Sequence, residues 1–136
     1  KIKPIETTGE LVKIIENVVP FNKKSGHPAK RIFQAVRIEV NGELKILDGA
    51  VTSAIRRLKF GGRIAVITFH SLEDRVIKNT FKNLSQGCIC PKSFPICVCG
   101  HKPEIKILGK AQIATTEEIY KNSRAKSAKL RTAEKI

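Results

Sequence analysis

Four polar residues that could do chemistry follow a short apolar run near the middle of the chain. The run from Ile64 to Ile67 is rich in β-formers and does not alternate with polar residues. This pattern favours a strand buried on both faces, as in a parallel sheet between helices. In open α/β sheets, catalytic groups gather beyond the carboxyl ends of such strands. The candidate catalytic residues are therefore His70, Ser71, Glu73 and Asp74.

The same residues also fit a purely structural role. Ser71 can cap a following helix, and Glu73 and Asp74 would then lie in its first turn, where carboxylates interact favourably with the helix dipole. His70 has no capping role in this interpretation, although a lone histidine is more often structural than catalytic. Capping and catalysis both stay open at this point.

All four cysteines lie in an irregular, proline-bearing segment, residues 86–102. Their spacing is C-x-C, six residues, C-x-C, formed by Cys88, Cys90, Cys97 and Cys99. Four thiolates gathered by a hairpin could hold a tetrahedral structural zinc, although C-x-C is a weaker signal than the usual C-x-x-C. The alternatives are reduced thiols packed together without a metal, or His101 in place of one thiol. Nothing indicates secretion, so disulfides are not expected.

Helical periodicity predicts the elements that position these groups. Thr7 and Glu10 have capping-box spacing, and the helix they begin would end at Pro20. A second helix would run from Ala29 to about Val40, a third from Glu43 or Asp48 to Lys59, and a fourth would follow Ser71. The expected apolar sides, in order, are Leu11, Ile14, Ile15 and Val18; Ile32, Phe33, Val36 and Val40; Leu47, Val51, Ala54, Ile55 and Leu58; and Val76, Ile77, Phe81 and Leu84.

Gly61 and Gly62 lie between the third helix and the apolar run. A glycine loop that binds phosphate follows a strand and opens a helix, whereas these glycines follow a helix and open a strand. They are therefore predicted to end the helix and turn the chain, and not to bind a cofactor. Further along, we expect a short strand at 105–108, a short helix from Thr115 to about Asn122, a linker-like stretch, and a terminal strand from about residue 128.

The charge balance predicts a polyanionic partner. Lys and Arg number 26 against 12 acids, a formal charge of +14, which favours nucleic acid over a role in solubility alone. On the second helix, Lys30, Gln34 and Arg37 form one polar row that faces either RNA or solvent, with Arg31, Lys23 and Lys24 nearby.

The 136 residues suit one ordinary domain. No apolar segment has the length that spans a membrane, and the first residues are mixed and polar. We therefore expect a soluble, cytoplasmic protein without a signal peptide or a membrane partner.

Several motifs occur in order along the whole chain: Thr7-Thr8-x-Glu10-Leu11, the stretch from His27-Pro28-Ala29 to Arg37-Ile38, Asn41-x-Glu43-Leu44, the stretch from Gly61 to Arg75, the paired C-x-C motifs, and Ser127-Ala128-Lys129-Leu130-Arg131. In this order they resemble the RsmH (MraW) family of ribosomal RNA methyltransferases. One departure is Ser123, where the family usually has proline.

The resemblance implies an α/β fold: the carboxyl-terminal part of a Rossmann-like class I methyltransferase sheet, with flanking helices and a cysteine-bearing loop. Residues 1–26 would end an inserted helical region and its linker, and residues 27–136 would form the carboxyl-terminal half of the Rossmann-like domain, with the cysteine loop at 86–102. The family's glycine-rich cofactor loop lies in its amino-terminal half. We therefore expect the main S-adenosylmethionine-binding residues upstream of this chain, and a fragment that is inactive alone.

The resemblance also implies a reaction and roles for residues. The family transfers a methyl group from S-adenosylmethionine to the N4 amine of a decoding-region cytosine in the 16S rRNA of the small ribosomal subunit. The four candidate catalytic residues would orient the cytosine or take up its proton. The expected RNA-binding residues are Lys30, Arg31, Gln34, Arg37 and Arg75. The alternative function is a stand-alone basic RNA-binding module with a structural metal on the four cysteines, and a homodimer stays open as a further partner.

Overall fold

The computed structural model describes residues 4–20, 26–91 and 94–136. The chain divides into two compact units, residues 1–43 and residues 44–136, and each is described by itself. Lys23 and Lys24, predicted to lie near an RNA-facing row, fall outside the described residues. The predicted boundary between residues 26 and 27, which would separate an inserted helical region from the Rossmann-like half, stays a prediction.

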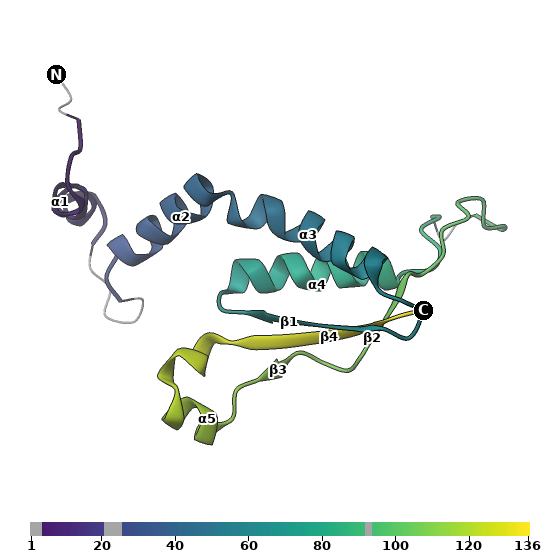
Figure 1. The fold of residues 1–136 in the computed structure, drawn as a ribbon. Helices are drawn as coiled ribbons and strands as arrows, with labels where there is room; N and C mark the ends of the chain where they lie inside the picture. Colours follow the sequence, from purple (N-terminus) through teal and green to yellow (C-terminus); the bar gives the residue numbers. More distant parts are fainter. Residues whose placement is uncertain (1–3, 21–25, 92–93) are drawn as a thin grey trace. The chain divides into compact units, whose positions relative to one another are not determined.

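The first unit contains two helices, α1 (Thr8–Val18) and α2 (Ala29–Asn41) (Figure 1). The predicted capping box begins α1: the Glu10 backbone N–H donates to Thr7 Oγ1 at 3.2 Å, and the Thr7 backbone N–H donates to the Glu10 carboxylate at 3.2 Å. The second helix ends at Gly42, whose φ of 61° is left-handed and suits glycine. Both helices are therefore confirmed, with bounds within one residue of those expected for α2.

The apolar faces predicted for these helices are only partly buried. In α1, Ile15 is buried whereas Ile14 and Val18 are exposed. In α2, the buried residues are Ala29 and Ile38, so the predicted buried side is wrong: Val36 and Val40 are exposed, and Ile32 and Phe33 are half-buried. Periodicity identifies residues that share a helix face, but it does not say how much of that face another element covers.

The second unit packs two helices on one face of a small sheet (Figure 1). Its elements are α3 (Glu43–Arg57), which begins at the boundary, β1 (Arg63–Thr68), α4 (Ser71–Ser85), β2 (Ile105–Ile107), β3 (Gln112–Ile113), α5 (Thr116–Lys121), a 3-10 helix (Ser123–Ser127) and β4 (Lys129–Lys135). The terminal strand and the short helix capped by Thr115 are confirmed. The expected linker is instead a 3-10 helix, and β3 was not predicted.

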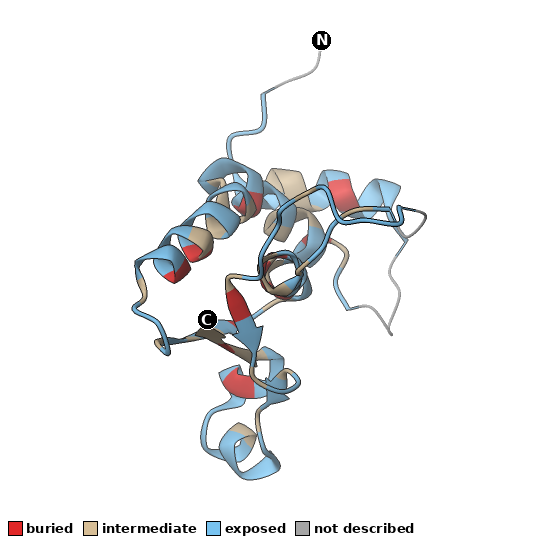
Figure 2. Cartoon of the chain, turned by 90° about the vertical axis from the view of Figure 1, so that its right-hand side faces the viewer, coloured by how far each residue is buried: buried red, intermediate tan, exposed pale blue. Residues whose placement is uncertain are grey.

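The core of this unit joins α3, α4 and two strands. Its buried residues, coloured red in Figure 2, are Val51, Ile55, Ile77, Phe81, Ile105 and Ala133. Six of the nine apolar residues predicted for α3 and α4 belong to or pack against this core, whereas Leu58 and Val76 are half-buried outside it and Ala54 is exposed. The two helices are also joined by a hydrogen bond that the Thr80 hydroxyl donates to the Asp48 carboxylate.

The sheet has β4 at its centre. Its strand order is β1-β4-β2, with β3 also paired to β4, and all these pairings are antiparallel. Because β1 and β2 both run opposite to β4, they run parallel to each other, and α4 connects them along the chain. The unit is therefore a βαβ crossover into which the last strand is inserted, which confirms the α/β class with flanking helices.

Only one face of β1 is covered in the described residues. Ile64 and Val66 pack against the core, whereas Ala65 and Ile67 on the other face are exposed. The expected burial on both faces is therefore wrong for this chain, because α3 and α4 both lie on the same side of the sheet. An unbroken apolar run does not reveal which elements cover it.

The two glycines before β1 end α3 and turn the chain, as predicted. Gly61 has a φ of +75°, and the Gly62 backbone N–H donates to the Lys59 carbonyl at 2.8 Å. A Cβ at Gly62 would lie 2.8 Å from that same backbone oxygen, which a real Cβ contact essentially never allows.

The close approach at Gly62 and the open space at Gly49 lead to stability predictions of opposite sign. Gly62→Ala should lower the free energy of unfolding by about 1–2 kcal/mol, because a backbone atom must move. Gly49→Ala, in the exposed interior of α3 with nothing within 4 Å of the added Cβ, should raise it by about 0.5–1 kcal/mol. Urea denaturation of both variants checks the prediction, which fails if the two changes have the same sign.

Candidate functional site

The candidate catalytic segment lies where β1 ends and α4 begins. His70, and not Ser71, is the residue that caps α4. His70 Nδ1 accepts a hydrogen bond from the Glu73 backbone N–H at 3.3 Å, and Glu73 Oε2 accepts from the backbone N–H groups of Phe69 at 2.9 Å and His70 at 3.2 Å. The expectation that Ser71 caps the helix, and that His70 has no capping role, is therefore wrong.

Hydrogen bonding, not spacing, explains this correction. A capping box needs an acid three residues after the cap, and both His70 and Ser71 have one, namely Glu73 and Asp74. The residue three after Ser71 is Asp74, whose carboxylate is bound elsewhere. The imidazole therefore takes the place of the usual Ser or Thr hydroxyl, and Ser71 becomes the first exposed residue of the helix.

The second ring nitrogen of His70 is buried without a hydrogen bond. His70 Nε2 lies 3.2 Å from Glu73 Oε1, but it has no hydrogen-bond partner among the described residues. Buried polar atoms are almost always paired, so such a nitrogen needs a specific explanation, such as a ligand or an ordered water. Capping uses Nδ1 alone and thus leaves Nε2 available for another role.

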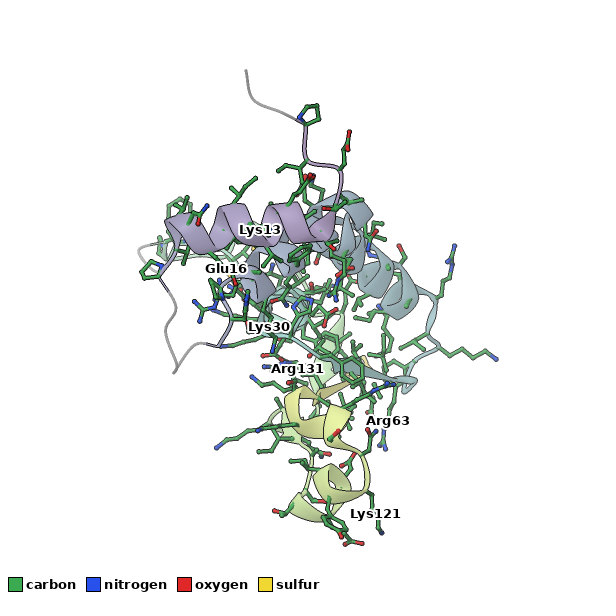
Figure 3. The ribbon with its side chains drawn as sticks, turned by 90° about the vertical axis from the view of Figure 1, so that its left-hand side faces the viewer. Lys13, Glu16, Lys30, Arg63, Lys121 and Arg131 are labelled. Carbon is green, nitrogen blue, oxygen red and sulfur yellow. The ribbon has the colours of Figure 1, made fainter. Side chains whose placement is uncertain are left out.

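Asp74 joins the start of α4 to the central strand. Its carboxylate accepts from Arg131 Nε at 2.7 Å and Nη2 at 3.2 Å, and from Lys129 Nζ at 3.4 Å (Arg131 is labelled in Figure 3). The hydrogen bond from Arg131 holds the pKa of Asp74 below its usual value; burial opposes this, and Lys129 adds to the lowering. A carboxylate held in this way is a poor proton acceptor and a good structural anchor.

The predicted site residues of this segment thus separate into three environments. His70 and Glu73 are joined in the capping box, Asp74 is turned to the cations of β4, and Ser71 and Arg75 are exposed. Sequence analysis missed Arg131 and Lys129 as partners of Asp74. Their alternation with apolar residues placed them on one strand face, but nothing local indicated an acid more than fifty residues away in the chain.

The RNA-binding candidates of α2 lie in the first unit. Lys30, Arg31 and Arg37 are exposed, and Gln34 is half-buried. Arg37 forms a two-pronged ion pair with Glu43, with Nε–Oε1 and Nη2–Oε2 distances of 3.1 and 3.3 Å. Arg37 is thus paired with a carboxylate, whereas Lys30 and Arg31, at the amino-terminal end of α2, have no ion pair among the described residues.

A cationic cavity in the second unit was not predicted. Its volume is about 230 Å³, and it lies between α4, β4 and residues 107–111. Phe81 and Ile107 form part of its apolar lining, and its cations are Lys78, Lys82, Lys110 and Arg131. The lysines come from two distant segments, so their convergence depends on the βαβ crossover and could not be seen in the sequence.

The four cysteines are brought together, as predicted. The Sγ–Sγ distances are 3.4 Å for Cys88–Cys97, 3.6 Å for Cys97–Cys99 and 3.8 Å for Cys88–Cys99, and all four Sγ atoms lie within 4.8 Å of one another. Hydrogen bonds from the backbone N–H groups of Ile89 and His101 lower the pKa of Cys99 to about 6. The Cys90 backbone N–H also lowers the pKa of Cys88, but its contacts with the other thiols raise it to about 12.

In the part of the chain that the structure describes, no helix combines the length and apolar character needed to cross a bilayer.

Comparison with known proteins gives a consistent result. The sequence model of the MraW methylase family matches residues 1–136. Two proteins named ribosomal RNA small subunit methyltransferase H are similar to the chain over 135 residues: one from Clostridium botulinum (strain Hall) at 56% identity and one from Caldicellulosiruptor saccharolyticus at 59%. Each match covers 98% of this chain but 44% of the relative. The chain thus spans less than half the length of these curated relatives.

Proposed function

Because this chain belongs to the MraW methylase family, we propose that it is the carboxyl-terminal part of an enzyme that methylates a cytosine of 16S rRNA. The methyl group comes from S-adenosylmethionine, and the acceptor is the N4 amine of a cytosine in the decoding region. The family match over residues 1–136 supports this proposal most strongly, because it includes the strand end, the cysteine loop and the final strand together. A cytoplasmic location follows from a ribosomal RNA substrate.

The cofactor is proposed to bind mainly to the rest of the whole enzyme. A nucleotide-binding loop follows a strand and opens a helix, and two such links occur in the described residues: Phe69-His70 between β1 and α4, and Ala114-Thr115 between β3 and α5. Neither contains glycine, and Gly61 and Gly62 end a helix. We therefore expect the 136 residues by themselves to be inactive.

The strand end is proposed to meet the target base. The cytosine must leave its stack, and its N4 lone pair is delocalised into the ring, so an acceptor that draws on the amine N–H bonds favours attack on the methyl group. The exposed Ser71 hydroxyl at the start of α4 suits this role. Because His70 Nδ1 accepts the capping hydrogen bond, the neutral imidazole carries its proton on the buried Nε2, which can donate to the O2 or N3 acceptor of the cytosine and so orient the base. Glu73 and Asp74 act indirectly, by fixing the imidazole and the helix start.

RNA is proposed to bind the cations of both units. Lys30, Arg31, Gln34 and Arg37 on α2 and Arg75 on α4 contact the backbone, together with the lysines of the cationic cavity. A net charge of +14 supports a polyanionic partner over a small neutral one. The cavity is lined by apolar side chains together with three lysines and an arginine, a combination that suits the ring and the phosphate of a nucleic acid.

This assignment predicts a specific salt dependence. Lys78→Ala, Lys82→Ala and Lys110→Ala should each weaken binding to 16S rRNA and reduce the slope of log affinity against log salt concentration by about 0.7–0.9 for each phosphate that the variant no longer neutralises. Lys121→Ala is the matched control, because Lys121 is exposed on α5 and paired with Glu117. Filter-binding titrations at several salt concentrations measure the slopes, and equal effects of all four substitutions would argue against the cavity.

A second candidate function is a stand-alone RNA-binding module, favoured by the net charge and the cysteine cluster. It predicts RNA binding without methyl transfer, even when the chain is joined to the amino-terminal part of a relative. The family proposal predicts methyl transfer by that joined protein, so a single activity measurement on it separates the two functions.

A further inference from the structure

We propose that the four cysteines of the loop at 86–102 bind one structural zinc ion. The geometry of the sulfur atoms is the first support. A zinc–thiolate bond of about 2.3 Å in a tetrahedron places neighbouring sulfurs about 3.8 Å apart. The Sγ–Sγ distances of 3.4, 3.6 and 3.8 Å among Cys88, Cys97 and Cys99 are close to this value. With Cys90 included, all four Sγ atoms lie within 4.8 Å of one another.

The same separations exclude disulfides in this structure. All four residues are free thiols, and the sulfurs are much farther apart than the bond of about 2.0 Å that a disulfide requires. A cluster of four unoxidised thiols with no acid or imidazole among them is a soft donor set, which selects zinc over magnesium or calcium.

A backbone hydrogen bond to sulfur provides a second support. The Cys90 backbone N–H donates to Cys88 Sγ at 3.4 Å. Such a donor disperses part of the negative charge that four thiolates place on one metal, and it fixes the direction of that sulfur. The tight C-x-C spacing therefore still allows a backbone N–H group to turn toward sulfur.

His101 lies outside the group of ligand atoms within 4.8 Å of one another, which consists of the four thiols. Its ring Nδ1 lies 2.7 Å from the Gly87 carbonyl oxygen, which joins the two ends of the cysteine segment. The four thiols thus remain as the ligand set, with every tetrahedral position filled by sulfur. A site without an open position is structural, so the zinc would not take part in methyl transfer.

The exposure of the loop explains why a metal is needed. Its apolar residues Ile89, Phe94, Ile96 and Val98 are all exposed, while the thiols face one another. A segment that buries so little apolar surface cannot hold its shape by packing, and a metal bound to four residues supplies the missing cross-links.

Metal analysis of the 136-residue chain tests this proposal independently of methyl transfer. The chain, purified under reducing conditions, should contain one zinc per molecule, and exchange with Co²⁺ should give the intense visible bands and thiolate charge-transfer absorption of tetrahedral cobalt–sulfur coordination. Cys88→Ser, Cys90→Ser, Cys97→Ser and Cys99→Ser should each lose these bands. Ile96→Ser, an exposed change between two ligands, is the matched control and should keep them.

Removal of zinc from the unmodified chain by a chelator gives a second test, whose result does not depend on whether the cysteine variants fold. Far-ultraviolet circular dichroism should change little when zinc is removed, because the core of the second unit excludes the loop, while the thiols should become much more reactive toward a thiol reagent. The proposal is overturned if the chain binds no zinc stoichiometrically, if zinc does not protect the thiols, or if any single cysteine can be replaced without loss of the cobalt bands.

Discussion

Asp74→Ala is expected to lower the free energy of unfolding of the chain by about 3 kcal/mol, the largest stability effect of any substitution considered. The substitution leaves Arg131, which is four-fifths buried, without its bidentate partner, and removal of one member of a buried ion pair is strongly destabilising. It also separates the first turn of α4 from the central strand. Denaturation by urea, followed by circular dichroism, measures the loss.

A surface ion pair provides the control for this prediction. Glu117→Ala removes the partner of Lys121 on α5, labelled in Figure 3, and both side chains of that pair are largely exposed. Exposed pairs contribute little, so this variant should unfold at nearly the same urea concentration as the original chain. Equal destabilisation by the two substitutions would show that the Asp74–Arg131 pair has no special role.

Stability should also fall in acid through the same carboxylate. The pKa of Asp74 is lowered in the folded chain, so its contribution is fully present above the unfolded pKa of about 3.9 and is lost as the pH falls through the lower folded pKa. Glu104, whose pKa is lowered by Lys135 and Arg56, acts in the same direction. The stability of Asp74→Ala should therefore depend less steeply on pH below about 4 than that of the original chain.

His70→Asn is expected to reduce the rate of methyl transfer by about 100-fold in a whole enzyme that contains this chain, the size of effect that misplacing a reacting group can have. Asparagine is a good helix cap, so the variant keeps an acceptor for the Glu73 backbone N–H but removes the buried Nε2. The substitution thus separates the structural role of His70 from its proposed role at the base.

A second histidine gives a matched comparison. His27 precedes Pro28, the residue that begins α2, and makes a related contact: its Nδ1 accepts from the Ala29 backbone N–H at 3.2 Å, while its Nε2 contacts Glu16 at 3.0 Å. His27→Asn should leave the methylation rate nearly unchanged. If His70→Asn retains full activity and an unchanged melting temperature, His70 is a helix cap and nothing more.

Local signals in the sequence predicted local structure well. The Thr7 and Thr115 caps, the glycine turn at Gly61-Gly62 and the terminal strand are each specified by a few adjacent residues, and all are present. Each depends on hydrogen bonds or backbone angles within a few residues, so chain topology has little influence on them.

The features that sequence analysis missed depend on distant partners. The central position of β4, the Asp74–Arg131 pair and the cationic cavity each join segments far apart in the chain. The His70 cap was missed because imidazole is an unusual cap. His70 and Ser71 each have an acid three residues later, so the distant Asp74–Arg131 pair decides between them. In β1, one face of the strand is exposed although the whole run is apolar. An apolar run therefore does not show that other elements of these 136 residues cover both faces of the strand.

Methyl transfer by a chimera tests the proposed function most directly. The amino-terminal part of the Caldicellulosiruptor saccharolyticus relative, joined to these 136 residues in place of its own matching 44%, forms a protein of whole length. Incubated with small ribosomal subunits that lack the modification and labelled S-adenosylmethionine, it should place the label on the N4 amine of one 16S rRNA cytosine, as nucleoside mass spectrometry would show, while the 136-residue chain alone places none. A folded chimera that binds S-adenosylmethionine but labels no cytosine, or labels another position, would contradict the assignment.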